Sequence, residues 1–381
     1  KRGSDRPRAF GGGKKKMSRF AKKAGFDIAP YTPGEQPKGR EYVKLNTNES
    51  PFPPSPAVIR AIEGGEASRL NLYSDPTASD LNRAIATRFS AVLEKEGKPP
   101  VSPEQVFSGN GSDEVLAFAF RAFCTGGVGA AFPVTGYGFY PVFAEFFGVP
   151  YKEVPMKDRF FVDVTRFDGL KETVVIANPN AQTGVYLPLS DIETLLLQDK
   201  DRLVIVDEAY CDFGGESAVK LLDAYDNLLV VMTMSKSRQL AGGRLGFAIG
   251  SKELVADLNG ARYGFNPYNI GRLGIVAGIA AISDEEYFVK TTSAVIAERK
   301  RLSEELVKLG FELTPSLANF VLAGKEGLDG KELYLALKER GVLVRWLGGD
   351  IADRIRITVG SREQNDALIA AIKDVFKEKG I

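Results

Sequence analysis

Three short, mostly apolar runs in the middle of the chain, each followed by polar residues, constrain the fold more than any other feature. The runs are residues 172–177, 202–206 and 227–232. Asn178 and Asp207 directly follow the first two, Lys236 lies just after the third, and both steps between these residues are 29 residues. A βαβ unit takes about 30 residues, so the spacing predicts parallel strands joined by helices. Such sheets bind ligands at the carboxyl ends of their strands.

Lys236 follows Ser235 at the mouth of a predicted buried strand, and Arg244 lies eight residues further on. Burial lowers the pKa of an amine, and a neutral lysine can condense with an aldehyde. A hydroxyl and an arginine nearby suit a phosphate group. A single Ser-Lys pair is more often part of a solvated loop, because most lysines lie on the surface. The even spacing of the three strand ends favours the chemical interpretation.

Asp207 and Tyr210 complete a set of groups that a pyridoxal phosphate ring requires. A buried acid at Asp207 would keep the pyridine nitrogen protonated, so that the ring can withdraw electrons from a substrate carbanion. Tyr210 would donate to the 3′ oxygen of the ring, while Lys236 would bind its aldehyde. The alternative for Asp207 is a helix cap after a strand, and the even spacing argues against it.

A glycine-rich segment, residues 108–114, precedes an apolar helical stretch at 115–124. Glycines followed by a hydroxyl residue at a helix start form an anion site from free backbone N–H groups and the helix dipole. The alternative is an ordinary N-cap, because serine and aspartate both cap well. Ser235 and Arg244 offer further donors, which favours phosphate binding.

The composition excludes several classes of site and partner. The chain has no histidine and two cysteines, which rules out Ser-His-Asp and Cys-His catalysis and histidine- or thiolate-ligated zinc. A net charge of +1 gives no general attraction to nucleic acid or membranes. No apolar run approaches the ~20 residues of a spanning helix. Cys124 and Cys211 make no disulfide framework, so we expect a reducing cytoplasm.

Longer motifs resemble the fold-type I, pyridoxal-phosphate-dependent aminotransferases, and among them the histidinol-phosphate aminotransferase family. The resemblance runs from about Tyr31 to about Val375. The motifs that carry it are residues 45–56, 109–116, 207–210, 235–236, 316–322 and 354–360. The Asn-Glu-Ser-Pro segment at 48–51 points to the narrower family. The resemblance implies an α/β large domain, with a mixed, mostly parallel sheet flanked by helices, and a smaller α+β domain.

The resemblance also implies roles in binding the cofactor, pyridoxal phosphate. Lys236 would hold its aldehyde and transfer protons, Asp207 would pair with the ring nitrogen, and Tyr210 with the 3′ oxygen. Tyr137, in a glycine-spaced aromatic turn, would stack on the ring, with core packing as the alternative. Tyr73 would reach the cofactor phosphate of a neighbouring subunit. The phosphate would otherwise be held by Gly111, Ser112, Asp113, Ser235 and Arg244.

Three further residues match substrate-binding positions of the family. Arg356 would bind the substrate α-carboxylate through a bidentate pair. Arg345 and Tyr31 match positions that meet the distal phosphate of histidinol phosphate. A structural salt bridge is the alternative for each arginine.

The chain departs from the family pattern at several positions. Ala181 and Gln182 replace the usual Asn-Pro before Thr-Gly. Either Asn178 or Asn180 takes over the contact to the 3′ oxygen, or Tyr210 makes it alone. Trp346 stands where the family often has histidine after the arginine, and Gly271 where asparagine is common, so the substrate is less firmly indicated than the cofactor.

We expect four segments along the chain. Residues 1–16 hold seven basic residues and one acidic residue without apolar periodicity, and we interpret them as vector-derived or an upstream extension. A nucleic-acid-binding arm is the alternative. Residues 17–56 form an N-terminal arm that packs on the small domain or a partner. The large cofactor-binding domain spans 57–283, and the small domain spans 284–381.

The sequence therefore predicts an aminotransferase that converts imidazole acetol phosphate and L-glutamate to L-histidinol phosphate and 2-oxoglutarate, a step of histidine biosynthesis. The alternatives are an aromatic amino-acid aminotransferase and a threonine-phosphate decarboxylase. A ligand sensor of a transcription regulator is a third, although such sensors carry a winged-helix domain ahead of the fold. Tyr73 and the arm make sense in a homodimer with shared active sites.

Overall fold

The computed structural model describes residues 18–23, 28, 30–31, 33–37 and 39–380. The basic segment 1–16, which we expect to be an extension, lies outside the described residues. Among the described residues near the N-terminus, Arg19–Lys23 form α1 and Pro56–Glu63 form α2. None of the helices in the described part of the chain has the length and apolarity needed to cross a bilayer.

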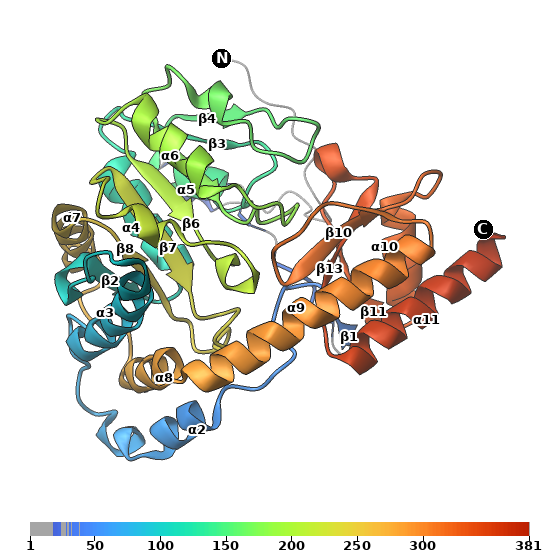
Figure 1. Ribbon diagram of the computed structural model, residues 1–381, viewed down its shortest axis with the longest axis horizontal. Coiled ribbons are helices and arrows are strands. Elements are labelled where there is room, and N and C mark those ends of the chain that lie inside the picture. Colours follow the sequence, from blue (N-terminus) through green and yellow to red (C-terminus); the bar gives the residue numbers. More distant parts are fainter. Residues whose placement is uncertain (1–17, 24–27, 29, 32, 38, 381) are drawn as a thin grey trace.

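A seven-stranded sheet forms the centre of the larger part of the molecule (Figure 1). Its strand order is β2-β8-β7-β6-β5-β3-β4. The strands are β2 (Val106–Gly109), β3 (Ala130–Pro133), β4 (Tyr151–Val154), β5 (Thr173–Ala177), β6 (Val204–Asp207), β7 (Leu228–Thr233) and β8 (Gly246–Ile249). β8 is antiparallel to both of its neighbours, whereas the other pairings are parallel. The predicted mixed, mostly parallel sheet is therefore confirmed.

The three apolar runs of the sequence form β5, β6 and β7, which lie side by side in the middle of the sheet. Every residue of these strands is buried, as is typical of parallel strands covered on both faces. Side chains alternate between the faces: along β6, Ile205 belongs to one apolar cluster, and Val204 and Val206 to the other. The carboxyl ends of the three strands therefore open at the same edge.

Helices cover both faces of this sheet. Side chains of α4, α5 and α7 join one apolar cluster, and those of α3, α6 and α8 join the other. The helices are α3 (Ser79–Leu93), α4 (Ser112–Phe123), α5 (Tyr140–Phe147), α6 (Leu189–Gln198), α7 (Lys252–Tyr263) and α8 (Arg272–Ser283). The arrangement is a three-layer α/β fold.

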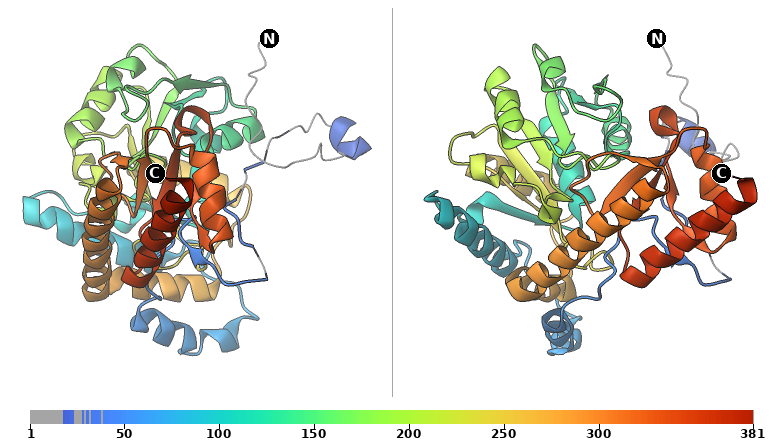
Figure 2. Two further views of the ribbon diagram at one scale, coloured as in Figure 1. Left: turned by 90° about the vertical axis from the view of Figure 1, so that its right-hand side faces the viewer. Right: turned by 45° about the vertical axis from the view of Figure 1, so that its right-hand side comes forward.

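The long helix α9 (Glu285–Lys308) leads from the large sheet to a smaller one (Figures 1 and 2). It begins where the Asp284 carboxylate accepts a hydrogen bond from the Tyr287 amide at 3.1 Å. The small sheet is antiparallel, in the order β12-β13-β10-β9. Its strands and helices are β9 (Glu312–Leu313), β10 (Phe320–Gly324), α10 (Gly330–Glu339), β12 (Arg345–Trp346), β13 (Arg354–Thr358) and α11 (Arg362–Lys379).

The N-terminal segment is fixed to the C-terminal part of the chain. β1 (Val43–Lys44) pairs in parallel with β11 (Val342–Leu343), and the Thr358 amide donates to the Leu45 carbonyl at 3.0 Å. Residues 46–49 consequently lie beside the end of β13 and next to the large sheet. Short 3₁₀ helices complete the fold: η1 (Glu66–Arg69), η2 (Glu94–Glu96), η3 (Pro103–Gln105), η4 (Val164–Phe167), η5 (Cys211–Phe213), η6 (Ala218–Leu221) and η7 (Gly349–Ile351).

Candidate active site

Lys236 lies in the turn that follows β7. The hydroxyl of Thr233, the last residue of β7, accepts a hydrogen bond from the Ser235 amide at 3.1 Å and donates to the Ser235 hydroxyl at 3.0 Å. This turn aims Lys236 at the N-terminal segment, where its Nζ donates to the Thr47 carbonyl at 3.1 Å. Burial lowers the pKa of the Lys236 amine to about 8, and the positive charge of Arg356 acts in the same direction. About a tenth of the amine is therefore neutral at pH 7.

Asp207 ends β6, beside the strand that leads to Lys236. Its Oδ2 accepts a hydrogen bond from the Tyr140 hydroxyl at 2.9 Å, and its Oδ1 accepts a longer one from the Ala209 amide at 3.3 Å. Burial raises the pKa of this carboxyl to about 6. The acid is therefore a buried group at the carboxyl end of a central strand, as the sequence predicts.

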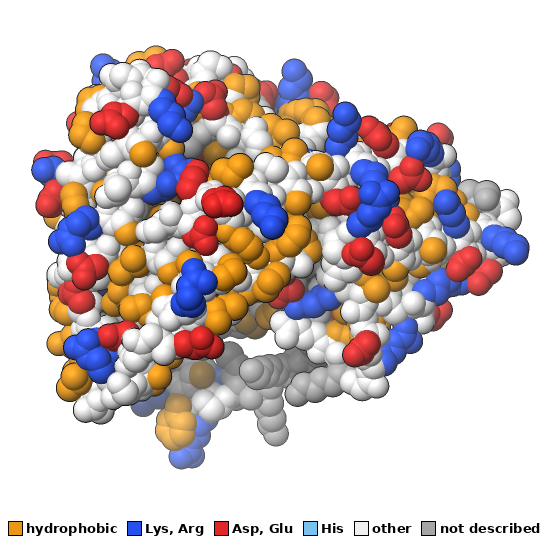
Figure 3. Space-filling view, turned by 60° about the horizontal axis from the view of Figure 1, so that its bottom comes forward, with side chains coloured by type: hydrophobic (Ala, Val, Ile, Leu, Met, Phe, Trp, Pro, Cys, Tyr) orange, Lys and Arg blue, Asp and Glu red, His pale blue; other side chains and the backbone are white. Residues whose placement is uncertain are grey.

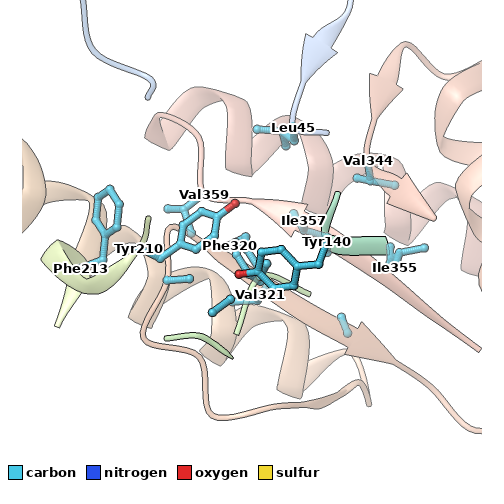
Figure 4. Close-up of a cluster of buried hydrophobic side chains, with 14 of the residues drawn as sticks. Leu45, Tyr140, Tyr210, Phe213, Phe320, Val321, Val344, Ile355, Ile357 and Val359 are labelled. Carbon is cyan, nitrogen blue, oxygen red and sulfur yellow. The ribbon is translucent and has the colours of Figure 1, made fainter. Parts of the chain in front are cut away.

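Tyr210 is held in place by a residue from the N-terminal segment. The Asn48 side-chain amide donates to the Tyr210 hydroxyl at 3.0 Å, and the Thr358 hydroxyl donates to the Asn48 side-chain oxygen at 3.0 Å. Because the Tyr210 oxygen already accepts from Asn48, its own proton stays available for another acceptor. Figure 4 shows Tyr210 and Tyr140 together with apolar side chains of the small sheet, such as Phe320.

The glycine-rich segment forms the start of α4, as its predicted anion-binding role requires. Ser112 and Asp113 are the first residues of this helix, where backbone N–H groups have no intrahelical partner. Gly111 has a φ of +86°, and a Cβ there would lie 2.7 Å from Arg244 Nη2. Arg244 Nη2 in turn lies 3.2 Å from Asp113 Oδ2. Only glycine lets the arginine approach this closely to the helix start.

Tyr137 reaches the same place from the turn before α5. Its hydroxyl donates to Asp113 Oδ1 at 2.8 Å. Its ring meets the ring of Tyr140 edge to face, with centroids 5.6 Å apart. The position suits the predicted stacking role, because Tyr137 contacts both Asp113 at the start of α4 and Tyr140, which donates to Asp207.

Asn178 and Asn180 both make hydrogen bonds to nearby backbone groups. The Asn178 amide donates to the Leu187 carbonyl at 2.9 Å and accepts from the Leu187 amide at 2.8 Å. The Asn180 side chain donates to the Thr135 carbonyl and accepts from the amides of residues 182 and 183. Both side-chain amides thus stabilise the backbone around them, and the contact to the 3′ oxygen stays a prediction for Asn178, Asn180 or Tyr210.

The two arginines predicted to bind substrate lie directly opposite each other on β12 and β13. Arg345 and Arg356 are paired in the sheet register. Arg356 Nη1 donates to the Ala181 carbonyl at 2.8 Å, while its Nε is buried without a hydrogen-bond partner. Burial is the main cause that lowers the pKa of Arg356, and Arg345 adds to it. Two neighbouring guanidinium groups favour an anionic ligand.

Tyr31 and Tyr73 differ in where they lie. The Tyr31 ring lies against that of Phe139, with centroids 4.7 Å apart, and 6.4 Å from that of Tyr137. Tyr31 therefore joins the aromatic side of the site. The Tyr73 side chain is 79% exposed, and its ring stacks on that of Tyr268 with centroids 4.5 Å apart.

Three contributors were not predicted as site residues. Asn48 lies in the Asn-Glu-Ser-Pro segment that carries the family resemblance, and Tyr140 lies three residues after Tyr137. Thr47 contributes only its carbonyl, which no side-chain pattern can indicate. The first two had a usable sequence signal, a polar side chain within a motif already singled out.

Comparison with known proteins shows the family to which the chain is similar. Residues 40–372 match the family model described as aminotransferase class I and II. The chain is 44% identical to histidinol-phosphate aminotransferase of Brachyspira hyodysenteriae, over 95% of this chain and 100% of the relative. It is 46% identical to histidinol-phosphate aminotransferase 2 of Dechloromonas aromatica, over 94% of this chain and 99% of the relative.

Solved structures share the fold. The histidinol-phosphate aminotransferase of Sinorhizobium meliloti in complex with pyridoxal-5′-phosphate has a TM-score of 0.79 at 24% identity, covering 89% of this chain and 92% of that chain. The histidinol-phosphate aminotransferase from Clostridium acetobutylicum has a TM-score of 0.78 at 25% identity, covering 88% of this chain and 99% of that chain.

Proposed function

The chain belongs to the class I and II aminotransferases, and we propose that it transfers an amino group from L-glutamate to imidazole acetol phosphate. The products are L-histidinol phosphate and 2-oxoglutarate, so the reaction is a step of histidine biosynthesis. The curated relatives described above carry the corresponding name over nearly the whole chain. The observation that carries the chemistry is the Lys236 amine, with its pKa lowered to about 8, at a strand end next to that of Asp207.

The residues present fit pyridoxal phosphate as the cofactor. Because Gly111 has no Cβ, Arg244 can lie close to the start of α4, where free N–H groups suit an anion. The buried carboxyl of Asp207 suits a protonated ring nitrogen. The hydroxyl of Tyr210 keeps a proton for the 3′ oxygen. Donors and acceptors therefore match the phosphate, nitrogen and hydroxyl of one ring.

Each of these residues has a defined task in the proposed reaction. When bound, pyridoxal phosphate supplies an aldehyde for the lysine amine and a ring that withdraws electrons from the substrate α-carbon. Lys236 takes and returns the proton at the α-carbon, because its lowered pKa lets the amine act as a base near neutral pH. Arg356, whose Nε has no partner, binds the α-carboxylate. Asp207 balances the charge of the ring nitrogen.

The proposed substrate preference rests on Arg345, which would bind the end of the substrate distant from the α-carboxylate. Arg345 lies opposite Arg356 in the sheet and supplies a second cation, which suits a phosphate distal to the α-carboxylate. An aromatic amino acid is the second candidate, since the rings of Tyr31, Phe139 and Tyr137 form one aromatic group. A planar ring without a phosphate would use this group but not Arg345.

Substrate kinetics of an arginine variant separate these two candidates. The kcat/KM for histidinol phosphate and for phenylalanine is measured in the parent and in Arg345→Ala. A hydrogen bond to a charged group contributes about 1.5–3 kcal/mol, so histidinol phosphate should lose roughly ten- to hundredfold while phenylalanine is little changed. Equal losses for both substrates would remove the phosphate role. Arg301→Ala, which breaks surface contacts to Glu298 and Asp366, is the matched control.

We further propose a homodimer. Exposed apolar side chains gather around α2 and the loop before α8, and they are Ile59, Ile62, Leu70, Leu72, Tyr73, Phe265 and Tyr268. Figure 3 looks onto the side of the molecule that carries α2 and shows apolar side chains there. Exposed apolar side chains gathered on one side of a protein are typical of an interface. Light scattering of the cofactor-loaded enzyme should give a dimer, and a fully active monomer would contradict the proposal.

A cytoplasmic location is part of the same proposal. Cys124 and Cys211 are both buried free thiols. Burial raises the pKa of the Cys124 thiol to about 12, so it stays unreactive. Free buried cysteines are expected in a reducing compartment.

A further inference from the structure

Tyr140 makes a contact that the proposed chemistry does not yet use. We propose that Tyr140 is a positioning residue that acts on bound pyridoxal phosphate through Asp207, by donating a hydrogen bond that keeps the carboxylate ionised and turned toward the ring nitrogen. The inference rests on the proposed function and deepens it. Tyr140 itself is not expected to touch cofactor or substrate.

The geometry fixes Tyr140 as a donor to this one carboxylate. Tyr140 is the first residue of α5, its side chain is fully buried, and its hydroxyl lies 2.9 Å from Asp207 Oδ2. Its ring packs against Phe120, with centroids 6.4 Å apart, and Phe132, with centroids 5.6 Å apart. The ring cannot swing aside without disturbing this core, so the hydroxyl is held at the carboxylate whether or not a ligand is present.

Asp207 needs such a donor because burial opposes its charge. Burial raises the pKa of Asp207 to about 6, and the negative charge of Asp113 on α4 acts in the same direction. The hydrogen bonds from Tyr140 and from the Ala209 amide oppose the rise. Tyr210, which follows β6, is a further titratable group whose charge interacts with this carboxylate. Tyr140 is therefore the side chain that offsets the desolvation of Asp207.

Tyr140 is also a donor at every working pH. Burial, together with Asp207, raises the pKa of the Tyr140 hydroxyl well above its ordinary value. The hydroxyl consequently keeps its proton and can donate it to Asp207. A carboxylate oxygen has two acceptor sites, so the hydrogen bond leaves the carboxylate able to accept from a protonated ring nitrogen as well.

The hydrogen bond from Tyr140 affects whether the proton between Asp207 and the ring nitrogen lies on the acid or on the ring. A donor to Asp207 makes its carboxyl a weaker base, so the proton between the acid and the ring stays on the ring nitrogen. Without the hydroxyl, the pKa of Asp207 should rise by about one to two pH units, as expected for the loss of a charge-assisted hydrogen bond. The proton then moves toward Asp207, and the ring withdraws electrons less strongly.

The test uses the enzyme loaded with pyridoxal phosphate that carries ¹⁵N in its ring. In the parent, the ¹⁵N chemical shift should be that of a protonated ring nitrogen at neutral pH. In Tyr140→Phe it should move toward the value of a neutral ring, and the dissociation constant for the cofactor should rise about tenfold or more. An unchanged ¹⁵N shift overturns the proposal.

The matched control removes a tyrosine–carboxylate hydrogen bond elsewhere. The Tyr225 hydroxyl donates to Glu193 Oε1 at 2.6 Å, so Tyr225→Phe deletes the same kind of contact on α6. It should leave both the ¹⁵N shift and the cofactor affinity at parental values. If Tyr225→Phe produces the same change as Tyr140→Phe, the effect is a general loss of stability and the proposal fails.

Two further experiments distinguish an effect of Tyr140 through Asp207 from a general structural effect of Tyr140. In an Asp207→Asn background, Tyr140→Phe should change cofactor affinity much less than in the parent, because the carboxylate it acts on is absent. With an analogue that has carbon in place of the ring nitrogen, Tyr140→Phe should likewise have little effect. If Tyr140→Phe lowers cofactor affinity in either experiment as much as it does in the parent, Tyr140 does not act through Asp207 and the proposal is refuted.

If Tyr140→Phe does not fold, a second replacement at position 140 tests the same hydrogen bond. Site-specific 3-fluorotyrosine at position 140 retains the shape and makes the hydroxyl a stronger donor, so the ¹⁵N shift should move toward fuller protonation. A shift toward a neutral ring would contradict the inference. Failure of the parent itself to bind pyridoxal phosphate would instead refute the proposed function.

Discussion

Replacing Asn48 tests how the N-terminal segment supports the site. The Asn48 side chain is 1% exposed, donates to the Tyr210 hydroxyl and accepts from the Thr358 hydroxyl, both at 3.0 Å. Its backbone has a φ of 54°, a left-handed conformation that asparagine and glycine adopt more readily than alanine. Asn48→Ala therefore removes two buried hydrogen bonds and strains the backbone, whereas Asn48→Gly removes only the hydrogen bonds.

The expected loss of unfolding free energy follows from these contacts. A buried group left without its partner costs about 1–3 kcal/mol, so the two hydroxyls left by either variant suggest a loss of about 2–6 kcal/mol. The left-handed backbone adds about 1 kcal/mol for alanine, while glycine loses a similar amount through its freer unfolded chain. The two variants should consequently be destabilised by similar amounts.

Urea denaturation of the cofactor-free protein measures this loss, from the midpoint and slope of the transition. Cofactor affinity should also fall, because Tyr210 is no longer held, and this second effect should largely disappear in a Tyr210→Phe background. If Asn48→Gly is as stable as the parent, the side-chain hydrogen bonds contribute nothing and the reasoning is refuted. A cofactor effect of Asn48→Ala that persists without the Tyr210 hydroxyl would disprove the link between them.

Two other substitutions have clear expected outcomes. Gly111→Ala places a Cβ 2.7 Å from Arg244 Nη2 and should weaken cofactor binding at least about tenfold by fluorescence titration, whereas Gly242→Ala, with nothing within 4 Å, should not. Burial raises the pKa of Glu208 to about 8, so its contribution to stability is present below pH ~4.5 and lost by pH ~8. Melting temperatures of the cofactor-free protein should therefore fall less across this range in Glu208→Gln, and an identical pH profile would contradict this.

The central strands could be predicted because their signal is local. The apolar runs before Asn178, Asp207 and Lys236 are short and evenly spaced, and they form the adjacent strands β5, β6 and β7. Parallel strands buried on both faces leave a continuous apolar run in the sequence. Their carboxyl ends meet at one edge by geometry alone, so strand identity was enough to bring Asp207 and Lys236 together.

The hydrogen-bond partners of the site could not be predicted in the same way. Asn178 and Asn180 lie at the correct strand end, yet their amides bond to backbone groups at Leu187 and Thr135. Those partners depend on loop paths that leave no pattern in the sequence. Asn48 contacts a residue 162 positions away. A residue type and its spacing indicate a group near the site, whereas its partner is decided by tertiary packing.

The central claim is that the amine of Lys236 binds the cofactor aldehyde covalently. Borohydride reduction of the cofactor-loaded protein, followed by peptide mass mapping, tests it most directly. A stable pyridoxyl phosphate mass should appear on the peptide that contains Lys236, and it should be absent in Lys236→Ala. No added mass on that peptide, or the same mass on another lysine, would contradict it.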